Sequence, residues 1–242
     1  MATSGTLLAP DLLATNSYWR LHSNVNGYSL PTGSSLATQA FRGRSFRIIN
    51  SIGPRLLVIL SEDGYRCWLD QDDVIDQAEQ CPPWKPMLFT SQEITLRLPE
   101  VLRQSGVAQR QPNIYLWGGT IGPNLDCSGL IQMAFASQNI WIPRDAYQQE
   151  QFCQPIAVTP KSTGMLRPGD LIFFGTPRRC THVGLYLGEG RYRHSSGRKY
   201  GRNGIDIDSL HPRDNHPVAC HYRAKLRGAG RVVCCHDGSA WV

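Results

Sequence analysis

The 242-residue sequence lacks any apolar run near the roughly 18 residues that a membrane-spanning helix needs. Its first residues also lack the basic and apolar segments of a secretory signal. We therefore expect a cytoplasmic protein without a membrane span. Basic residues outnumber acidic ones by 25 to 19, but they are scattered, and no zinc-knuckle or helix-turn-helix spacing occurs. Binding to nucleic acid is not expected.

The cysteines also lack the spacing of a metal site, because none of the eight forms a C-x-x-C pair. The segment Cys234-Cys235-His236 alone offers too few ligands for a closed zinc site. In a chain of this size without a secretion signal, reduced thiols are expected rather than disulfides. We expect neither a metal nor a cofactor.

Glycine and proline are plentiful, with 23 and 16 residues, and apolar residues make up 41% of the chain. This composition is typical of a folded protein with many turns and short strands. Four strand-like runs separated by turns predict a small β-barrel: 35–41, 45–50, 56–60 and 65–70. Pro82, Pro83 and Pro86 then forbid regular helix or ladder hydrogen bonding. We predict a domain over residues 1–82 and a linker over 83–92.

The second predicted domain covers residues 93–242. Helical patterns come first, over 93–105, 127–138 and 146–152. Strand-like runs follow, over 171–174, 182–187, 191–195 and 218–226. Helices followed by strands predict an α+β domain. Residues 228–242 match no pattern and are predicted to be a frayed end.

The segment Asp126-Cys127-Ser128-Gly129 places a cysteine at the start of a helix that is apolar nearly all round. The first turn of a helix has backbone N–H groups without intrahelical partners, and its dipole favours negative charge. Such a position, with an imidazolium nearby, lowers the pKa of a cysteine from about 8.5 to roughly 3.5–7.5. The pattern indicates a nucleophile, although a cysteine in a buried helix is more often a packing residue.

Two strand-like runs joined by Gly188-Glu189-Gly190 predict a hairpin that carries two histidines. If the loop has three residues, Leu187 lies opposite Arg191. His182 and His194 then lie diagonally on one face of the sheet, within reach of each other. A two-residue loop would place them on opposite faces.

These residue types suit thiol acyl transfer. His182 would take the proton of Cys127, and His194 would hold the His182 ring in its orientation and tautomer. The Cys127 backbone N–H and the Tyr115 hydroxyl would stabilise the oxyanion that forms when the thiolate attacks a carbonyl. Each residue also has a structural interpretation, as a hydrogen-bonded core histidine or a core aromatic. The residues alone leave both interpretations open.

Several motifs occur in a fixed order: Tyr115-x-Trp117-Gly118-Gly119, Leu125-Asp126-Cys127-Ser128-Gly129-Leu130, Pro168-Gly169-Asp170-Leu171, His182-Val183-Gly184-Leu185-Tyr186 and His194-Ser195-Ser196-Gly197. Together they resemble the NlpC-type cysteine peptidases, which cut peptidoglycan peptides. The resemblance implies a papain-like fold with a Cys-His-His triad at Cys127, His182 and His194, and a motif tyrosine at Tyr115. The first domain resembles the bacterial SH3-like domain of some of these enzymes, mainly through strand spacing and Asp63-Gly64-Tyr65-x-x-Trp68.

In relatives with these two domains, the implied reaction is hydrolysis of the bond between γ-D-glutamate and a diamino acid, in peptides that begin with a free L-alanine. The implied partner is the peptidoglycan stem peptide L-Ala-γ-D-Glu-diamino acid, met in recycling or remodelling of the wall. Selection of a free amine needs acceptors in a closed cleft. The candidate substrate-binding residues are Asp126, Ser128, Tyr65, Asp73 and Ser196. Asp126 could equally be only the N-cap of its helix.

Two other functions stay open. An amidase or acyltransferase would use the same thioester chemistry on another acyl donor. A binding module would hold a cell-wall peptide in the barrel while the second domain stays inert, but competent residue types at all three triad positions favour an enzyme. We expect the protein to act as a monomer.

Overall fold

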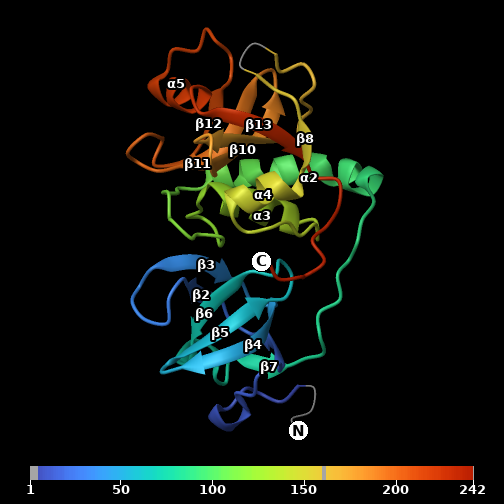
Figure 1. The fold of residues 1–242 in the computed structure, drawn as a ribbon, viewed down its shortest axis with the longest axis vertical. Helices are drawn as coiled ribbons and strands as arrows, with labels where there is room; N and C mark the ends of the chain where they lie inside the picture. Colours follow the sequence, from blue (N-terminus) through green and yellow to red (C-terminus); the bar gives the residue numbers. More distant parts are fainter. Residues whose placement is uncertain (1–4, 160–161, 242) are drawn as a thin grey trace. The chain divides into compact units, whose positions relative to one another are not determined.

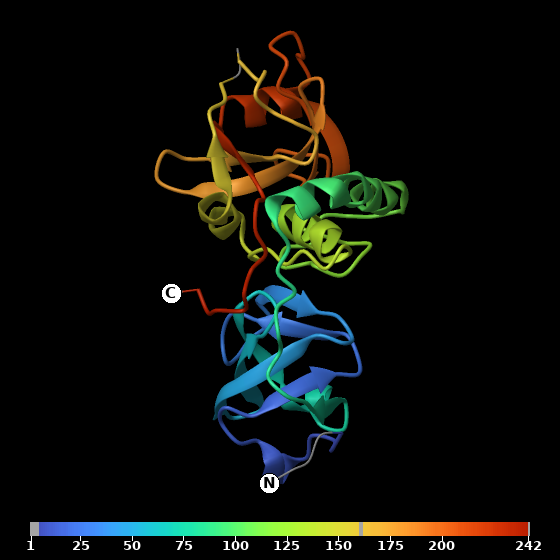
Figure 2. The same ribbon diagram turned by 90° about the vertical axis from the view of Figure 1, so that its right-hand side faces the viewer.

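The computed structural model describes residues 5–159 and 162–241, and the chain divides into two compact units (Figures 1 and 2). The first unit contains the residues up to Met87 together with those from His236 onward, and the second is Leu88–Cys235. Among the described residues, no helix is both long and apolar enough to cross a membrane.

The first unit consists of short strands with two short helical turns. Its elements are η1 Pro10–Leu12, β1 Tyr18–Leu21, β2 Val25–Tyr28, β3 Leu36–Ala40, β4 Ser45–Ile52, β5 Arg55–Leu60, β6 Arg66–Asp70, α1 Gln71–Val74 and β7 Ala78–Gln80. The seven strands form one antiparallel sheet in the order β3-β2-β6-β5-β4-β1-β7. This confirms an all-β first domain.

The core of the first unit contains the apolar side chains of alternate strand positions, with Trp19, Phe46 and Val58 almost fully buried. Strands β3 to β6 agree with the four predicted runs to within two residues at each end. Strands β1, β2 and β7 have no predicted counterpart. They contain three or four residues each, too few to display a period of two.

A buried ionic cluster connects the start of β4 to the turn after β5. Arg44 donates to Glu62 at 3.1 Å and to Asp63 at 2.7 Å, and all three side chains are nearly inaccessible to solvent. Glu62 also accepts the backbone N–H of Ser45 at 2.6 Å, and Asp63 accepts that of Tyr65 at 3.2 Å. The cluster therefore fixes the turn that precedes β6.

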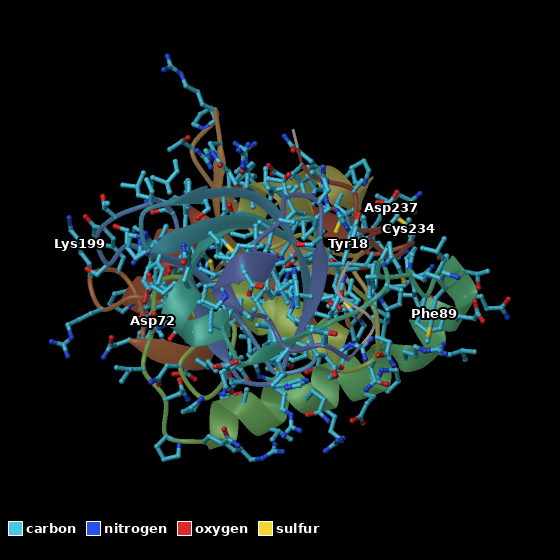
Figure 3. The ribbon with its side chains drawn as sticks, turned by 90° about the horizontal axis from the view of Figure 1, so that it is seen from below. Tyr18, Asp72, Phe89, Lys199, Cys234 and Asp237 are labelled. Carbon is cyan, nitrogen blue, oxygen red and sulfur yellow. The ribbon has the colours of Figure 1, made fainter. Side chains whose placement is uncertain are left out.

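The C-terminal residues are not the frayed end that the sequence predicts. Leu226–Arg231 is strand β13 of the second unit, and Val232 and Cys235 are buried. The chain then leaves the second unit for the first. Figure 3 labels Cys234 and Asp237, which stand just before and just after this crossing.

The residues after the crossing pack on the turn between β5 and β6. His236 is buried and its ring donates to the backbone of Glu62. A Cβ on Gly64 would overlap with the carbonyl oxygen of Ser239, and Gly64 has φ +66°, so only glycine admits this contact. Residues 236–241 are thus packed as part of the first unit.

The second unit contains the remaining helices and strands. They are α2 Ser91–Arg110, α3 Cys127–Ala136, α4 Ala146–Phe152, β8 Gln154–Ile156, β9 Leu171–Gly175, β10 Cys180–Gly188, β11 Arg191–Ser196, β12 Gly204–Ser209, α5 Pro217–Arg223 and β13. The strands form a sheet in the order β12-β11-β10-β9-β13-β8. Helices before a mainly C-terminal sheet confirm the predicted α+β class.

Helices cover both faces of this sheet. In Figures 1 and 2, α2, α3 and α4 lie together on one side, and α5 lies on the other. Phe173 and Val183 pack with the three helices in one core, whereas Phe174 and Tyr186 pack with α5 in another. Side chains of alternate residues therefore enter different cores.

Helix α2 extends beyond its predicted end at Gly106. It begins at a capping box formed by Thr90 and Glu93, and it continues to Arg110. Ala108, in the additional turn, packs with Leu125 and neighbouring residues in a small core. Burial of this turn outweighs the tendency of glycine to end a helix.

The predicted strand over 218–226 is wrong, because Pro217–Arg223 is helix α5. His216 caps this helix by accepting the N–H of Val218 at 3.2 Å, and Pro217 occupies the first turn, where no N–H is needed. Strand β12 has no predicted counterpart. Its Ile-Asp-Ile-Asp alternation over 205–208 is nevertheless a period-two pattern that indicates a strand.

Replacing Arg44 with methionine leaves two buried carboxylates without their cation. Breaking a buried ion pair from one side costs about 3–5 kcal/mol, so Arg44→Met should lower the free energy of unfolding of the first unit by that amount. Urea denaturation, with hydrogen exchange of β4 and β5 as a local probe, measures the change. Arg42 is exposed, and Arg42→Met is the matched control, expected to change stability by less than about 0.5 kcal/mol. Equal losses in both variants would contradict the role of the cluster.

Candidate active site

Asp126 holds the start of helix α3. It accepts the backbone N–H of Gly129 at 2.7 Å and that of Gly118 at 2.9 Å. Arg144 donates to both carboxylate oxygens, at 2.6 Å and 3.2 Å, and the Ser128 hydroxyl lies 3.3 Å away. Ser128 also accepts from Arg144 at 2.9 Å. The N-cap interpretation of Asp126 is confirmed, and Ser128 belongs to the same buried network.

The start of α3 meets the sheet at the end where β10 begins and β11 ends. The Ser195 hydroxyl donates to the carbonyl of Leu125 at 2.6 Å. The Cys127 sulfur accepts the backbone N–H of Val183, the residue that follows His182. The nucleophile therefore lies next to the strand that carries the predicted base.

The register of the β10–β11 hairpin is the one predicted for a three-residue loop. Leu185 pairs with Arg193, and Tyr186 pairs with Tyr192. Both histidines consequently lie on one face of the sheet, and their rings are in contact. The prediction that they share a face is confirmed.

The connection itself differs from the predicted loop. Gly188 pairs with Arg191, so only Glu189 and Gly190 form the turn, with φ of 53° and 73°. A β-bulge between Tyr186 and Gly188 adds one residue to β10. The bulge restores the register that a two-residue turn alone would have shifted by one residue.

The two histidines continue into a row of polar side chains. The Nε2 atom of His182 lies 2.7 Å from Nδ1 of His194, and Nε2 of His194 lies 2.9 Å from Oδ2 of Asp208. Arg202 donates to Asp208 through Nη2 at 2.7 Å and through Nε at 3.3 Å. Asp208 is not among the predicted site residues. The alternation in β12 could have identified it, because Asp206 pairs with His194 and Asp208 follows on the same face.

Helix α5 covers the face of the sheet that carries the histidines. The ring of Tyr222 stacks on that of His182, with centroids 4.2 Å apart and an interplanar angle of 25°. Tyr222 is hydrogen-bonded to Ser196, which is fully buried and accepts the backbone N–H of Arg202 at 2.9 Å. Ser196, a predicted substrate-binding residue, thus holds the side chain of Tyr222 in the structure.

Gly184 lies on the same face of β10 as His182. A Cβ at this position would lie 2.6 Å from the ring of Tyr192 and 3.5 Å from the Cβ of His194. Only glycine therefore lets the aromatic side chains of β11 pack closely against β10.

Burial decides the protonation of the nucleophile. It raises the pKa of Cys127 to about 12, and the charge of Asp126 acts in the same direction. The N–H of Val183, the charge of Arg144 and the N–H of Ser128 lower this pKa without restoring it. The result differs from the lowered pKa expected at a helix start. Burial destabilises the thiolate by desolvation more than these three groups stabilise it.

Burial also lowers the pKa of His182 well below its ordinary value, and the charges of His194 and His221 lower it further. Burial likewise lowers the pKa of His194, although Asp208 opposes this shift. At neutral pH the free protein therefore holds a neutral thiol beside neutral imidazoles. Proton transfer then has to accompany attack on a substrate.

Tyr115 lies near the nucleophile, as predicted. A Cβ on Gly197 would lie 3.6 Å from its ring, so the ring rests against this glycine. Burial raises the pKa of Tyr115, and Asp126 and the ionised form of Cys127 raise it further. The hydroxyl therefore stays protonated and can donate to a developing oxyanion.

The remaining two predicted substrate-binding residues belong to the first unit. Tyr65 is half-buried against the core of the first unit. Asp73 is exposed in α1, and partial burial together with the charges of Asp70 and Asp72 raises its pKa. Their contact with a substrate stays a prediction.

Comparison with known families matches both units. Residues 112–219 match the NlpC/P60 family, and residues 27–74 match the bacterial dipeptidyl-peptidase Sh3 domain. The chain carries an NlpC/P60 domain preceded by a bacterial SH3-like domain. The resemblance stated from the motifs is confirmed, and the matched range of the NlpC/P60 domain contains Cys127, His182, His194 and Asp208. Tyr222 lies beyond it.

Curated relatives that match part of this chain include two cell-wall enzymes. Murein DD-endopeptidase MepS/Murein LD-carboxypeptidase of Escherichia coli is 34% identical over 120 residues, 49% of this chain and 55% of that protein. Bifunctional muramidase/DL-endopeptidase CwlT of Bacillus subtilis is 36% identical over 121 residues, 48% of this chain and 33% of that protein. The chain thus spans about half of one relative and a third of the other.

A solved NlpC/P60 family protein from Bacillus cereus aligns with 90% of this chain and 64% of its own, at 20% identity and a TM-score of 0.45.

Because the pKa of Cys127 is raised to about 12, its thiolate fraction should rise about tenfold per pH unit between about pH 6 and 10. The rate of alkylation by iodoacetamide, followed on the Cys127 peptide by mass spectrometry, should rise in parallel. A blocked cysteine peptide in the same reaction is the reference, and its rate should level off near pH 9.5, about one unit above its ordinary pKa of about 8.5. A rate at Cys127 that is constant from pH 6 to 8 would instead indicate a preformed thiolate–imidazolium pair.

Proposed function

We propose that the protein is a cysteine endopeptidase that hydrolyses the bond between γ-D-glutamate and the diamino acid of peptidoglycan stem peptides. The row His182, His194 and Asp208, with the Cys127 sulfur hydrogen-bonded to the backbone of the neighbouring Val183, is the observation that carries this proposal. The NlpC/P60 match and the printed names of MepS and CwlT, both endopeptidases, support it.

The proposed reaction proceeds through a thioester. The sulfur of Cys127 attacks the γ-carbonyl carbon while its proton passes to His182, and the carbonyl electron pair moves onto oxygen. The backbone N–H of Cys127 and the hydroxyl of Tyr115 donate to this oxyanion. Collapse of the intermediate expels the amine of the diamino acid, which takes the proton from His182. Water then attacks the thioester by the same route, and the thiol is restored.

We further propose that the substrate begins with a free L-alanine amine. An ionised carboxylate offers about four lone-pair sites, and five donor contacts from this chain already surround Asp126. Recognition of the ammonium is therefore assigned to other acceptors, with Tyr65 and Asp73 as candidates. A peptide with a free N-terminus is detached from the glycan strand, which favours a role in recycling of wall fragments.

Incubation with L-Ala-γ-D-Glu-diaminopimelate should release L-Ala-γ-D-Glu, detected by mass spectrometry. Cys127→Ala should abolish release, because loss of a nucleophile costs up to about 10⁶-fold in rate. Cys234 is an exposed cysteine, and Cys234→Ala is the control that should keep full activity. No dipeptide from the wild type, or undiminished release by Cys127→Ala, would refute the peptidase. Cleavage at another amide or transfer to another acceptor would favour the amidase or acyltransferase.

Acetylation of the L-alanine amine removes the charge that a buried acceptor would pair with. The loss should cost about 3 kcal/mol of transition-state stabilisation, or roughly 10²-fold in kcat/KM. Acetylation of the distal amine of the diamino acid is the control for added bulk. If both acetylated peptides are cleaved as fast as the parent, amine selection is excluded while the triad stands.

A further inference from the structure

Asp208 is a buried carboxylate with a donor at each oxygen. Its Oδ1 accepts from Arg202 Nη2 at 2.7 Å, and its Oδ2 lies 2.9 Å from Nε2 of His194. Burial raises the pKa of Asp208, but the hydrogen bonds from His194 and Arg202 outweigh it and lower the pKa below its ordinary value. The carboxylate is therefore ionised at neutral pH and can only accept hydrogen bonds.

Because Asp208 can only accept, it determines the tautomer of His194. The Nε2 atom of His194 must carry the proton that Asp208 accepts. A neutral imidazole has one N–H, so Nδ1 of His194 holds a lone pair. Burial keeps both rings neutral.

The same reasoning determines the tautomer of His182. Nδ1 of His194 lies 2.7 Å from Nε2 of His182, so Nε2 of His182 must carry a proton. Its Nδ1 atom is then the unprotonated nitrogen. A general base needs a lone pair, and this ring has its lone pair on the nitrogen that faces away from His194.

We infer that Asp208, held by Arg202, is a positioning residue that sets the tautomers of both histidines and leaves Nδ1 of His182 as the acceptor of the Cys127 proton. The inference deepens the proposed function and rests on it for its effect on turnover. Groups around the guanidinium stabilise its position: His216 Nε2 lies 3.0 Å from Arg202 Nη1 and Asp206 lies 3.6 Å from its Nε. His216 Nδ1 also lies 3.9 Å from Asp208.

Asp208→Asn tests the inference because the amide keeps the shape and loses the charge. Arg202 donates to Oδ1 through Nη2 at 2.7 Å and to Oδ2 through Nε at 3.3 Å, and the shorter contact should keep the amide oxygen at the Oδ1 position. The NH2 group then faces His194, and the longer contact from Nε is lost. His194 would then carry its proton on Nδ1, and His182 would also carry its proton on Nδ1. With no lone pair toward the thiol, kcat should fall by roughly 10²–10⁴-fold, as when the aspartate of a Ser-His-Asp triad is amidated, with KM within about threefold.

Glu189→Gln is the control, since Glu189 is an exposed carboxylate in the turn of the β10–β11 hairpin and its partner Arg191 is exposed as well. It should leave kcat and both tautomers unchanged. An equal loss of kcat in Asp208→Asn and Glu189→Gln would overturn the inference.

The imidazole ¹⁵N chemical shifts of the full-length protein give a readout that needs no turnover. In the wild type, both His182 and His194 should show protonated Nε2 and bare Nδ1, and Asp208→Asn should reverse both. This separates failure of the inference from failure of the proposed function. A wild-type spectrum with protonated Nδ1 on His182 overturns the inference, even if Asp208→Asn does not fold. Unchanged tautomers in a folded Asp208→Asn protein overturn it as well.

Discussion

The ion pair between Asp126 and Arg144 is the constraint on which the site depends. It joins three segments at once: the first turn of α3, the loop at Gly118 and the residues before α4. A buried ion pair adds little to the stability of the fold, because desolvation of the two charges is costly. Removal of either partner, however, leaves the other charge buried and unpaired. The pair therefore specifies where α3 begins. That start determines the position of the Cys127 sulfur against the backbone of β10.

The second requirement is the alignment of three strands. His182, His194 and Asp208 come from β10, β11 and β12, and each residue reaches the next only because the strand registers place them on one face. A shift of one residue in either pairing would turn a member of the row to the opposite face. The bulge between Tyr186 and Gly188 and the missing side chain at Gly184 thus matter for the alignment of the row as much as its polar atoms do.

The sequence predicts those parts of the molecule that short-range patterns encode. The position of Cys127 at a helix start, the common face of the histidines and strands β3 to β6 follow from capping, alternation and turn residues. The roles of Ser196 and Tyr222 depend on α5 packing over strands that come before it in the chain, and the raised pKa of Cys127 depends on its burial. Desolvation arises from the whole fold, so a local motif cannot reveal it.

The first unit is discontinuous, and this affects how the chain is made. Residues from His236 onward complete the packing around Gly64 and Glu62, yet they follow the whole second unit in the chain. At a translation rate of roughly 5–20 residues per second, the intervening stretch of about 150 residues takes about 7–30 s to synthesise. During this interval the turn between β5 and β6 stays uncovered. The second unit therefore emerges from the ribosome while the first unit still awaits its final segment.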